Sequence, residues 1–244
     1  TGASNKDRTV FIRGVGTITT SPGVEPSVST VLDGVVLSRP GQSTLDLVDI
    51  QRIEVLRGPQ GTLFGKNASA GVINIVSKDP TSTLSGYGDA SYFSGGEYRV
   101  KASLAGPLVD GRLNGLISVV GAGFKGNVND VLHGGKINGY EHSGVRIKLI
   151  GTPTDQLTVT FGLDYVGGKE DAPNGVFSST DRVAYPTNVV TANPALATLL
   201  AAYGVTAGPN NKSAVASIGS TVKDRNGGGV LQLDYQWGDF VLTS

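Results

Sequence analysis

The sequence contains no cysteine and no methionine, and only 16% of its residues are charged. Without cysteine, neither a disulfide framework nor a cysteine-based metal site is available. The 20 basic and 20 acidic residues cancel, so the chain as a whole exerts no long-range attraction on nucleic acid or anionic lipid. The composition therefore predicts no nucleic-acid partner.

Long apolar runs are also missing. The longest helix-like apolar stretch, residues 195–203, is about half as long as a membrane helix requires. Transmembrane helices are therefore not expected, whereas barrel strands remain open because they alternate and barely register on hydropathy. The absence of Met and of a signal peptide favours a chain without its natural ends, cut within a last strand at Phe240–Ser244.

Glycine is abundant, at 36 of 244 residues, and the first 83 residues combine it with short strand-forming segments. Such glycine-rich, weakly charged sequence is typical of a β-structure with many turns. A helical turn is expected at Leu45–Val48. Residues 1–83 therefore predict a small mixed α+β domain, with strands at Val10–Arg13, Val28–Leu32, Gly34–Leu37, Ile50–Leu56 and Val72–Ser77.

From residue 84 the segments become longer, and apolar and polar residues alternate in them. Neighbouring residues of a strand, such as Leu163 and Asp164, point to opposite faces. Each segment therefore has one apolar and one polar face, and is about as long as a tilted strand that crosses a bilayer. The expected strands are Leu84–Phe93, Glu97–Leu108, Arg112–Phe124, Tyr140–Thr152, Gln156–Val166, Gly229–Trp237 and Phe240–Ser244.

The connections between these segments alternate in length. Val109–Gly111, Pro153–Asp155 and Gly238–Asp239 are tight, whereas the connections between them, at Gly95–Gly96, 125–139 and 169–228, are looser, and the last is very long. Outer-membrane barrels have short periplasmic turns and long extracellular loops, whereas a soluble sandwich has no reason to sort its loops. The pattern favours a membrane barrel. Because only a closed sheet can span lipid, these few strands must continue, pair with other chains or represent a fragment.

Four motifs occur in order within the first region. They are Phe11–Gly14, Leu32–Val35, the run Asp49–Gly65 (DIQRIEVLRGPQGTLFG) and the close Ala68–Lys78 (ASAGVINIVSK). Together they resemble the plug domain of TonB-dependent outer-membrane transporters, while the second region resembles the family only in pattern.

The resemblance implies a membrane all-β fold: a plug at 1–83, truncated at its N-terminus, then the first strands of a barrel of about 22 strands at 84–244, truncated at its C-terminus. It implies active uptake of a siderophore, cobalamin or glycan across the bacterial outer membrane. The partners implied are outer-membrane lipid, the ligand and TonB, which would grip a missing N-terminal segment. No cofactor is implied.

The resemblance also indicates site residues. In the family, plug arginines pair with carboxylates of the barrel wall, a role that falls to Arg57 and also suits Arg13; ordinary surface charge is the alternative. Arg52, Glu54 and Arg57 are expected on the polar side of one strand. The plug-motif and contact residues are Arg13, Gly14, Asp33, Gly34, Arg52, Glu54, Arg57, Gly58, Pro59, Gly65, Gly71 and Asn74. The resemblance places the outward-facing plug loops so that Ser21, Arg39 and Gln42 are candidate ligand contacts. The alternative, that they are solvated loop residues without a role in binding, is equally favoured.

Other functions find little support. The segment Gly61–Asn67 has three residues between its glycines and Asn after Lys, so it fails the phosphate-loop pattern. His133 and His142 favour neither a metal site nor a catalytic triad, and no enzyme is expected. Asn193, Pro194 and Gly204 indicate a capped short helix that packs in a loop or forms a lid. A passive porin or a surface adhesin stays open as the alternative function.

Overall fold

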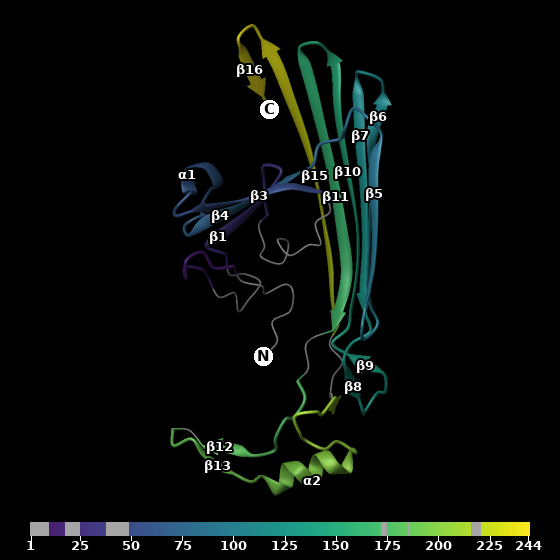
Figure 1. Ribbon diagram of the computed structural model, residues 1–244. Helices are drawn as coiled ribbons and strands as arrows, with labels where there is room; N and C mark the ends of the chain where they lie inside the picture. Colours follow the sequence, from purple (N-terminus) through teal and green to yellow (C-terminus); the bar gives the residue numbers. More distant parts are fainter. Residues whose placement is uncertain (1–9, 18–24, 38–48, 172–174, 185, 216–220) are drawn as a thin grey trace.

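The structure is a computed structural model that describes residues 10–17, 25–37, 49–171, 175–184, 186–215 and 221–244. Two sheets dominate it (Figure 1): a long, upright sheet of seven strands, and a four-stranded sheet that projects from one of its faces. We call them the long sheet and the small sheet. No helix among the described residues is long and apolar enough to cross a membrane.

The small sheet has the strand order β2-β1-β4-β3, with β1 parallel to β4 and the other pairs antiparallel. Its core consists of Val31, Ala68 and Val72, against which Leu56 and Phe64 pack. Burial of these side chains joins the strands to the turn that follows β3. The elements are β1 (Val28–Leu32), β2 (Val35–Leu37), β3 (Ile50–Arg57), the single helical turn α1 (Gly61–Phe64) and β4 (Gly71–Ser77).

Two turns differ from the sequence expectation. Asp33 and Gly34 both have positive φ, 47° and 82°, as a two-residue hairpin turn requires, so β2 begins at Val35. The predicted strand Val10–Arg13 is wrong. Arg13 and Gly14 form a tight turn, and only an isolated bridge joins Ile12 to Val15. The helical turn predicted at 45–48 lies outside the described residues.

The long sheet is an antiparallel meander in the order β16-β15-β11-β10-β7-β6-β5. All seven predicted strands are present. β6 and β10 extend one or two residues past their predicted ends, and β11 and β15 are several residues longer than expected. The charged and glycine-rich ends of β11 and β15 obscure the alternation and yet pair residue for residue from Gly167/Arg225 to Asp171/Thr221. The strands are β5 (Ser85–Phe93), β6 (Glu97–Val109), β7 (Leu113–Phe124), β10 (Tyr140–Thr154), β11 (Leu157–Asp171), β15 (Thr221–Trp237) and β16 (Phe240–Thr243).

The two faces of the long sheet differ in chemistry. The inner face, which contacts the small sheet, carries buried polar residues such as Ser118, Arg146 and Lys148. The outer face carries exposed apolar side chains, from Leu163 to Trp237. A band of exposed apolar side chains that covers one face of a sheet is uncommon on soluble monomers. Such a band is typical of the lipid-facing wall of a barrel.

The connections gather by length at the two ends of the long sheet (Figure 1). Tight turns close one end, and the short elements β8, β9, β12, β13, β14 and α2 lie at the other, together with the short β5–β6 turn at residues 94–96. The predicted helix is confirmed as α2 (Pro194–Ala202): the Asn193 side chain accepts a hydrogen bond from the Leu196 amide, and Gly204 follows with φ 71°. The remaining strands are β8 (Val128–Asp130), β9 (Lys136–Ile137), β12 (Arg182–Ala184), β13 (Val189–Thr191) and β14 (Ser213–Ala214).

Gly71 provides a test of this packing. Its φ is 152°, and a Cβ at this position would lie 2.5 Å from the Leu56 carbonyl oxygen and 2.6 Å from Ile12 Cδ1. We expect Gly71→Ala to lower the free energy of unfolding by about 2 kcal/mol, because backbone would have to move. Urea denaturation of the folded protein measures this, with Gly61→Ala as the control, since a Cβ there meets nothing within 4 Å. An equal effect of the two substitutions would contradict the packing described.

Candidate functional site: the junction of the small sheet and the long sheet

Asp49 is the most buried acidic residue of the junction, with 6% of its surface exposed. It stands just before β3 with φ 56°. Its carboxylate accepts a hydrogen bond from Ser118 Oγ on β7 of the long sheet, and Ser118 Oγ lies 3.2 Å from Ser103 Oγ on β6. Lys78 Nζ approaches the same carboxylate at 3.9 Å. Asp49 is therefore compensated by donors from both sheets.

Lys148 makes the second connection. It is 8% exposed on β10 of the long sheet, and its Nζ lies 2.7 Å from Asp79 Oδ1 and donates to Ser77 Oγ at 3.2 Å. Ser77 in turn donates to Asp33, through its amide at 2.8 Å and its hydroxyl at 2.7 Å. The chain Asp33–Ser77–Lys148 thus ties the β1–β2 turn and the end of β4 to the wall.

A cavity of about 180 Å³ lies beside these contacts, between the β1–β2 hairpin and strands β10, β11 and β15. Both carboxylates and cations line it: Asp33, Asp164, Arg146 and Lys148. Arg146 and Asp164 are cross-strand neighbours in the β10–β11 register, so opposite charges stand directly across from each other. Apolar side chains of the hairpin, such as Val35 and Leu37, line the rest of it. A cavity of this size with charged groups in its lining has room for ordered water. The junction is therefore a charged, hydratable contact rather than an apolar core.

A second polar cluster lies on the inner face near the long loops. Tyr140 Oη donates to Glu97 at 2.5 Å, and Arg99 lies 3.1 Å from the same carboxylate. The Tyr140 ring is also 5.3 Å from His142 and 6.2 Å from Phe124, centroid to centroid. Aromatic faces beside a cation suit a flat, anionic ligand. No sequence motif predicts this cluster, because its members come from three strands, β6, β7 and β10.

The expected site residues lie mainly on the small sheet. Arg52 Nε pairs with Glu54 Oε1 at 2.7 Å, and Asn74 Nδ2 donates to Glu54 Oε2 at 2.8 Å. Arg57 is exposed on the opposite face of β3, in register with Gly71; the expectation that it shares a face with Arg52 and Glu54 is wrong, because side chains alternate along a strand.

The expected residues that lie in turns are found in three different parts of the small sheet. Gly58 and Gly65 have φ of 82° and 80° and flank α1, and exposed Pro59 precedes this helical turn. Asp33 and Gly34 lie at the junction itself, whereas Arg13 and Gly14 form the exposed turn near β1. The expected ligand contacts Ser21, Arg39 and Gln42 fall outside the described residues.

The contacts that the structure describes between the small sheet and the long sheet do not involve the expected arginines. The resemblance suggested arginines of the small sheet against carboxylates of the wall. In the described part of the chain, neither Arg13 nor Arg57 makes an ion pair, and the contacts instead join Asp49 and Asp79 to Ser118 and Lys148. The wall thus supplies the donors and the small sheet the acceptors.

The two histidines have separate partners. His133 Nδ1 lies 2.8 Å from Asp130 Oδ2 in the loop after β8, and His142 stacks near Tyr140. Among the described residues, no group of three or more His, Cys, Asp or Glu side chains could hold a metal ion.

Comparison with known proteins agrees with this architecture. Residues 1–72 match the family model of the TonB-dependent Receptor Plug Domain. The pesticin receptors of Yersinia enterocolitica and Yersinia pestis are 37% identical over 150 residues, which is 61% of this chain and 22% of theirs. The chain is homologous to TonB-dependent receptors. It spans less than a third of the length of these relatives.

Solved structures of TonB-dependent receptors share the fold. The ferric yersiniabactin uptake receptor FyuA of Yersinia pestis superposes with a TM-score of 0.67 at 26% identity, over 90% of this chain and 31% of that one. The ferripyoverdine receptor of Pseudomonas aeruginosa, with a TM-score of 0.60 at 17% identity over 86% of this chain and 25% of that one, shows the fold alone. The small sheet is thus a plug and the long sheet a piece of barrel wall. These relatives are receptors of the outer membrane rather than enzymes.

Lys148 tests the attachment of the plug. Lys148→Met removes the ion pair with Asp79 and the donor to Ser77, so we expect plug attachment to weaken by about 2 kcal/mol. Ion conductance of the reconstituted receptor in planar bilayers should rise. Lys66→Met is the matched control, because its equally short pair with Glu25, 2.6 Å, is exposed and does not touch the wall. Equal conductance of the two variants would contradict the attachment.

The hydrogen bonds of Glu54 predict that the stability of the plug decreases at acid pH. Hydrogen bonds from Arg52 and then from Asn74 hold the pKa of Glu54 below its ordinary value of 4.5. A lowered folded-state pKa stabilises the plug above about pH 4.5, and this contribution disappears as the pH falls through the folded-state pKa. Unfolding temperatures measured between about pH 3 and about pH 7 should therefore fall less steeply for Glu54→Gln than for the wild type. Arg52→Gln should remove the larger part of the same dependence, and identical acid profiles in all three proteins would refute it.

Proposed function

We propose that the chain forms the plug, residues 1–83, and the first barrel strands, residues 84–244, of an active outer-membrane transporter. Its role is the uptake of a scarce nutrient, gated by the plug. The matching of 1–72 to the plug family supports this division, as does the change from a mixed sheet ending at Ser77 to a meander starting at Ser85.

The single observation that carries the proposal is the nature of the junction. The plug meets the wall through hydrogen bonds and an ion pair, at Asp49–Ser118 and Lys148–Asp79, beside a cavity whose lining includes charged side chains. Each such contact contributes about 1–3 kcal/mol and can be replaced by water. A plug held in this way is stable at rest and is released by a modest pull, without exposing a large apolar core.

The partner proposed for this pull is TonB, acting on a segment that precedes the plug. We propose a siderophore as the first ligand class, since two similar proteins are named a ferric yersiniabactin uptake receptor and, in Escherichia coli, a ferrienterobactin receptor. Cobalamin and glycans are the other classes. The inner-face cluster of Arg99, Tyr140 and His142 is the candidate contact for an aromatic, anionic chelate. Binding and translocation need no catalytic step.

Uptake of radiolabelled iron tests the proposal. The natural gene product that carries this chain is expressed in a bacterial strain lacking its own ferric-chelate receptors, and a panel of ferric siderophores is supplied. We expect uptake of at least one siderophore in cells with TonB and a loss of at least about tenfold in cells without it.

The competing functions give different results. Equal uptake with and without TonB would indicate a passive porin. Binding of cells or surfaces without any uptake of siderophore, cobalamin or glycan would indicate an adhesin. Arg99→Gln should weaken ligand binding, measured by fluorescence quenching, without changing the amount of folded receptor.

A further inference from the structure

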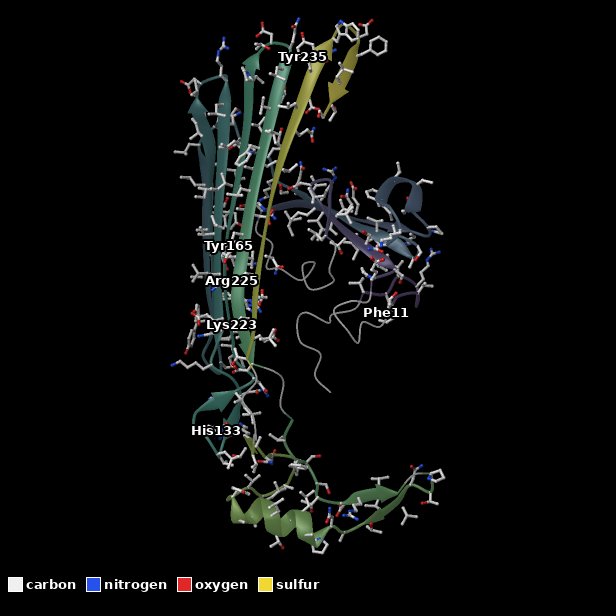
Figure 2. The ribbon with its side chains drawn as sticks, turned by 180° about the vertical axis from the view of Figure 1, so that it is seen from behind. Phe11, His133, Tyr165, Lys223, Arg225 and Tyr235 are labelled. Carbon is white, nitrogen blue, oxygen red and sulfur yellow. The ribbon has the colours of Figure 1, made fainter. Side chains whose placement is uncertain are left out.

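The inner-face cluster of Arg99, Tyr140 and His142 contains its own carboxylate. Glu97 is the first residue of β6, at the end of the long sheet that bears the long loops, where Figure 2 labels His133. The side chain of Glu97 is 27% exposed and that of Arg99 is 42% exposed, so both can be reached from solvent. The end with the long loops is the extracellular end of an outer-membrane barrel. A ligand that arrives from outside therefore meets Arg99 together with a carboxylate.

One oxygen of Glu97 holds both donors of the cluster. Glu97 Oε1 accepts from Tyr140 Oη at 2.5 Å and from Arg99 Nε at 3.1 Å. Arg99 Nη2 lies 3.1 Å from the same oxygen and 3.5 Å from Tyr140 Oη, so the three side chains form a closed triangle. Hydrogen bonds to an ionised group are roughly twice as strong as those between neutral groups. Glu97 thus occupies the positions that an anionic oxygen of a ligand would take.

The strand register holds this triangle in place. Arg99 on β6 and His142 on β10 are both directly opposite Ala122 on β7. Ala122 is 1% exposed, and the longer side chains of the two flanking strands meet above its methyl group. Tyr140 thereby reaches Glu97 across β7, although 43 positions separate them in the sequence. Backbone pairing, rather than a long loop, therefore positions the carboxylate.

The carboxylate changes which ligands the cluster attracts. Glutamate is ionised at neutral pH, so the charge of Glu97 offsets that of Arg99. An anionic group that approaches Arg99 must displace Glu97, and this carboxylate also repels it. A neutral ligand with aromatic surface meets no such penalty, because Tyr140 and His142 still offer their rings. Repulsion of one ligand class is a general source of specificity.

We propose that Glu97 is the charge selector of the ligand site: it disfavours multiply anionic chelates and admits chelates of low net charge. Three catecholates leave Fe³⁺ strongly negative, whereas three hydroxamates neutralise it, so the two kinds of chelate differ in the penalty that Glu97 imposes. The inference rests on the proposed function, because it assigns a role within the same candidate ligand contact. It narrows the siderophore class to chelates whose charge is low enough to coexist with Glu97.

The test uses the natural gene product that carries this chain, purified in mild detergent. Glu97→Gln keeps an oxygen that can accept from Tyr140 and Arg99 but removes the charge. Glu141→Gln is the matched control: Glu141 follows Tyr140 on β10 and therefore faces outward, where it pairs with Lys169 at 2.9 Å. Fluorescence quenching measures the affinity of each protein for a ferric tris-catecholate and for a ferric trihydroxamate.

We expect Glu97→Gln to raise the affinity for the tris-catecholate by at least about tenfold, because a like charge is removed, with little change for the trihydroxamate. Glu141→Gln should match the wild type. The double variant Glu97→Gln/Arg99→Gln should lose the gain, because the gain depends on the guanidinium. An unchanged or lower affinity of Glu97→Gln for the tris-catecholate would overturn the selector. An equal gain for both chelates would also overturn it, since that result indicates a change of shape rather than of charge.

Two further measurements separate this result from the proposed function. Heat-dependent migration on gels shows that each variant is folded. Iron uptake is measured in cells with and without TonB. Uptake by the wild type, with no gain in affinity for Glu97→Gln, would overturn the selector alone. A gain in affinity for Glu97→Gln in a receptor that delivers no iron would contradict the transport proposal alone.

Discussion

Buried polar groups need partners, and this constraint governs how the plug meets the wall. Asp49 and Lys148 are both more than nine-tenths buried, and each would cost several kcal/mol without compensation. Their partners come from the opposite sheet: Ser118 for Asp49, and Ser77 and Asp79 for Lys148. Electrostatics and hydrogen bonding therefore help to fix the position of the small sheet on the wall, while the exposed apolar residues of the wall, such as Leu163 and Trp237, lie on its outer face.

The alternation of side chains along the wall strands suits the different environments on the two faces of the long sheet. On β10, Ile147 faces outward between the inward-facing Arg146 and Lys148. A strand with this pattern is stable only with an apolar medium on one side and a polar, filled interior on the other. The plug has its own small core around Val31 and Val72, which is separate from its contacts with the wall. The plug can thus keep its own fold while its contacts with the wall exchange with water.

The sequence predicts the fold closely where local pattern decides it. The period-two segments predict all seven wall strands, and Asn193 and Gly204 predict the ends of α2. The sequence does not predict those strand ends whose position depends on pairing with a neighbouring strand. Gly227 and Gly228, before the predicted start of the strand at Gly229, have no hydropathic pattern, yet they lie in β15 because β11 offers a partner for each. The junction was the hardest part, because its contacts, Asp49 with Ser118 and Ser77 with Lys148, join residues about 70 positions apart. Asp49 opens one of the motifs, but Ser118 and Lys148 belong to none. Arg57 was misplaced because its motif was considered without the register of β3.

The central claim is that the plug rests against the inner wall through Asp49 and Ser118. The chain contains no cysteine, so Asp49→Cys/Ser118→Cys introduces a new cysteine pair. Oxidation, or a short bis-methanethiosulfonate reagent, can join this pair through reducible disulfide bonds. The account predicts rapid cross-linking in the folded receptor, loss of uptake while the link persists, and recovery on reduction, with neither single cysteine showing the effect. Absence of cross-linking in a correctly folded receptor, under conditions that join the pair after denaturation, would contradict it.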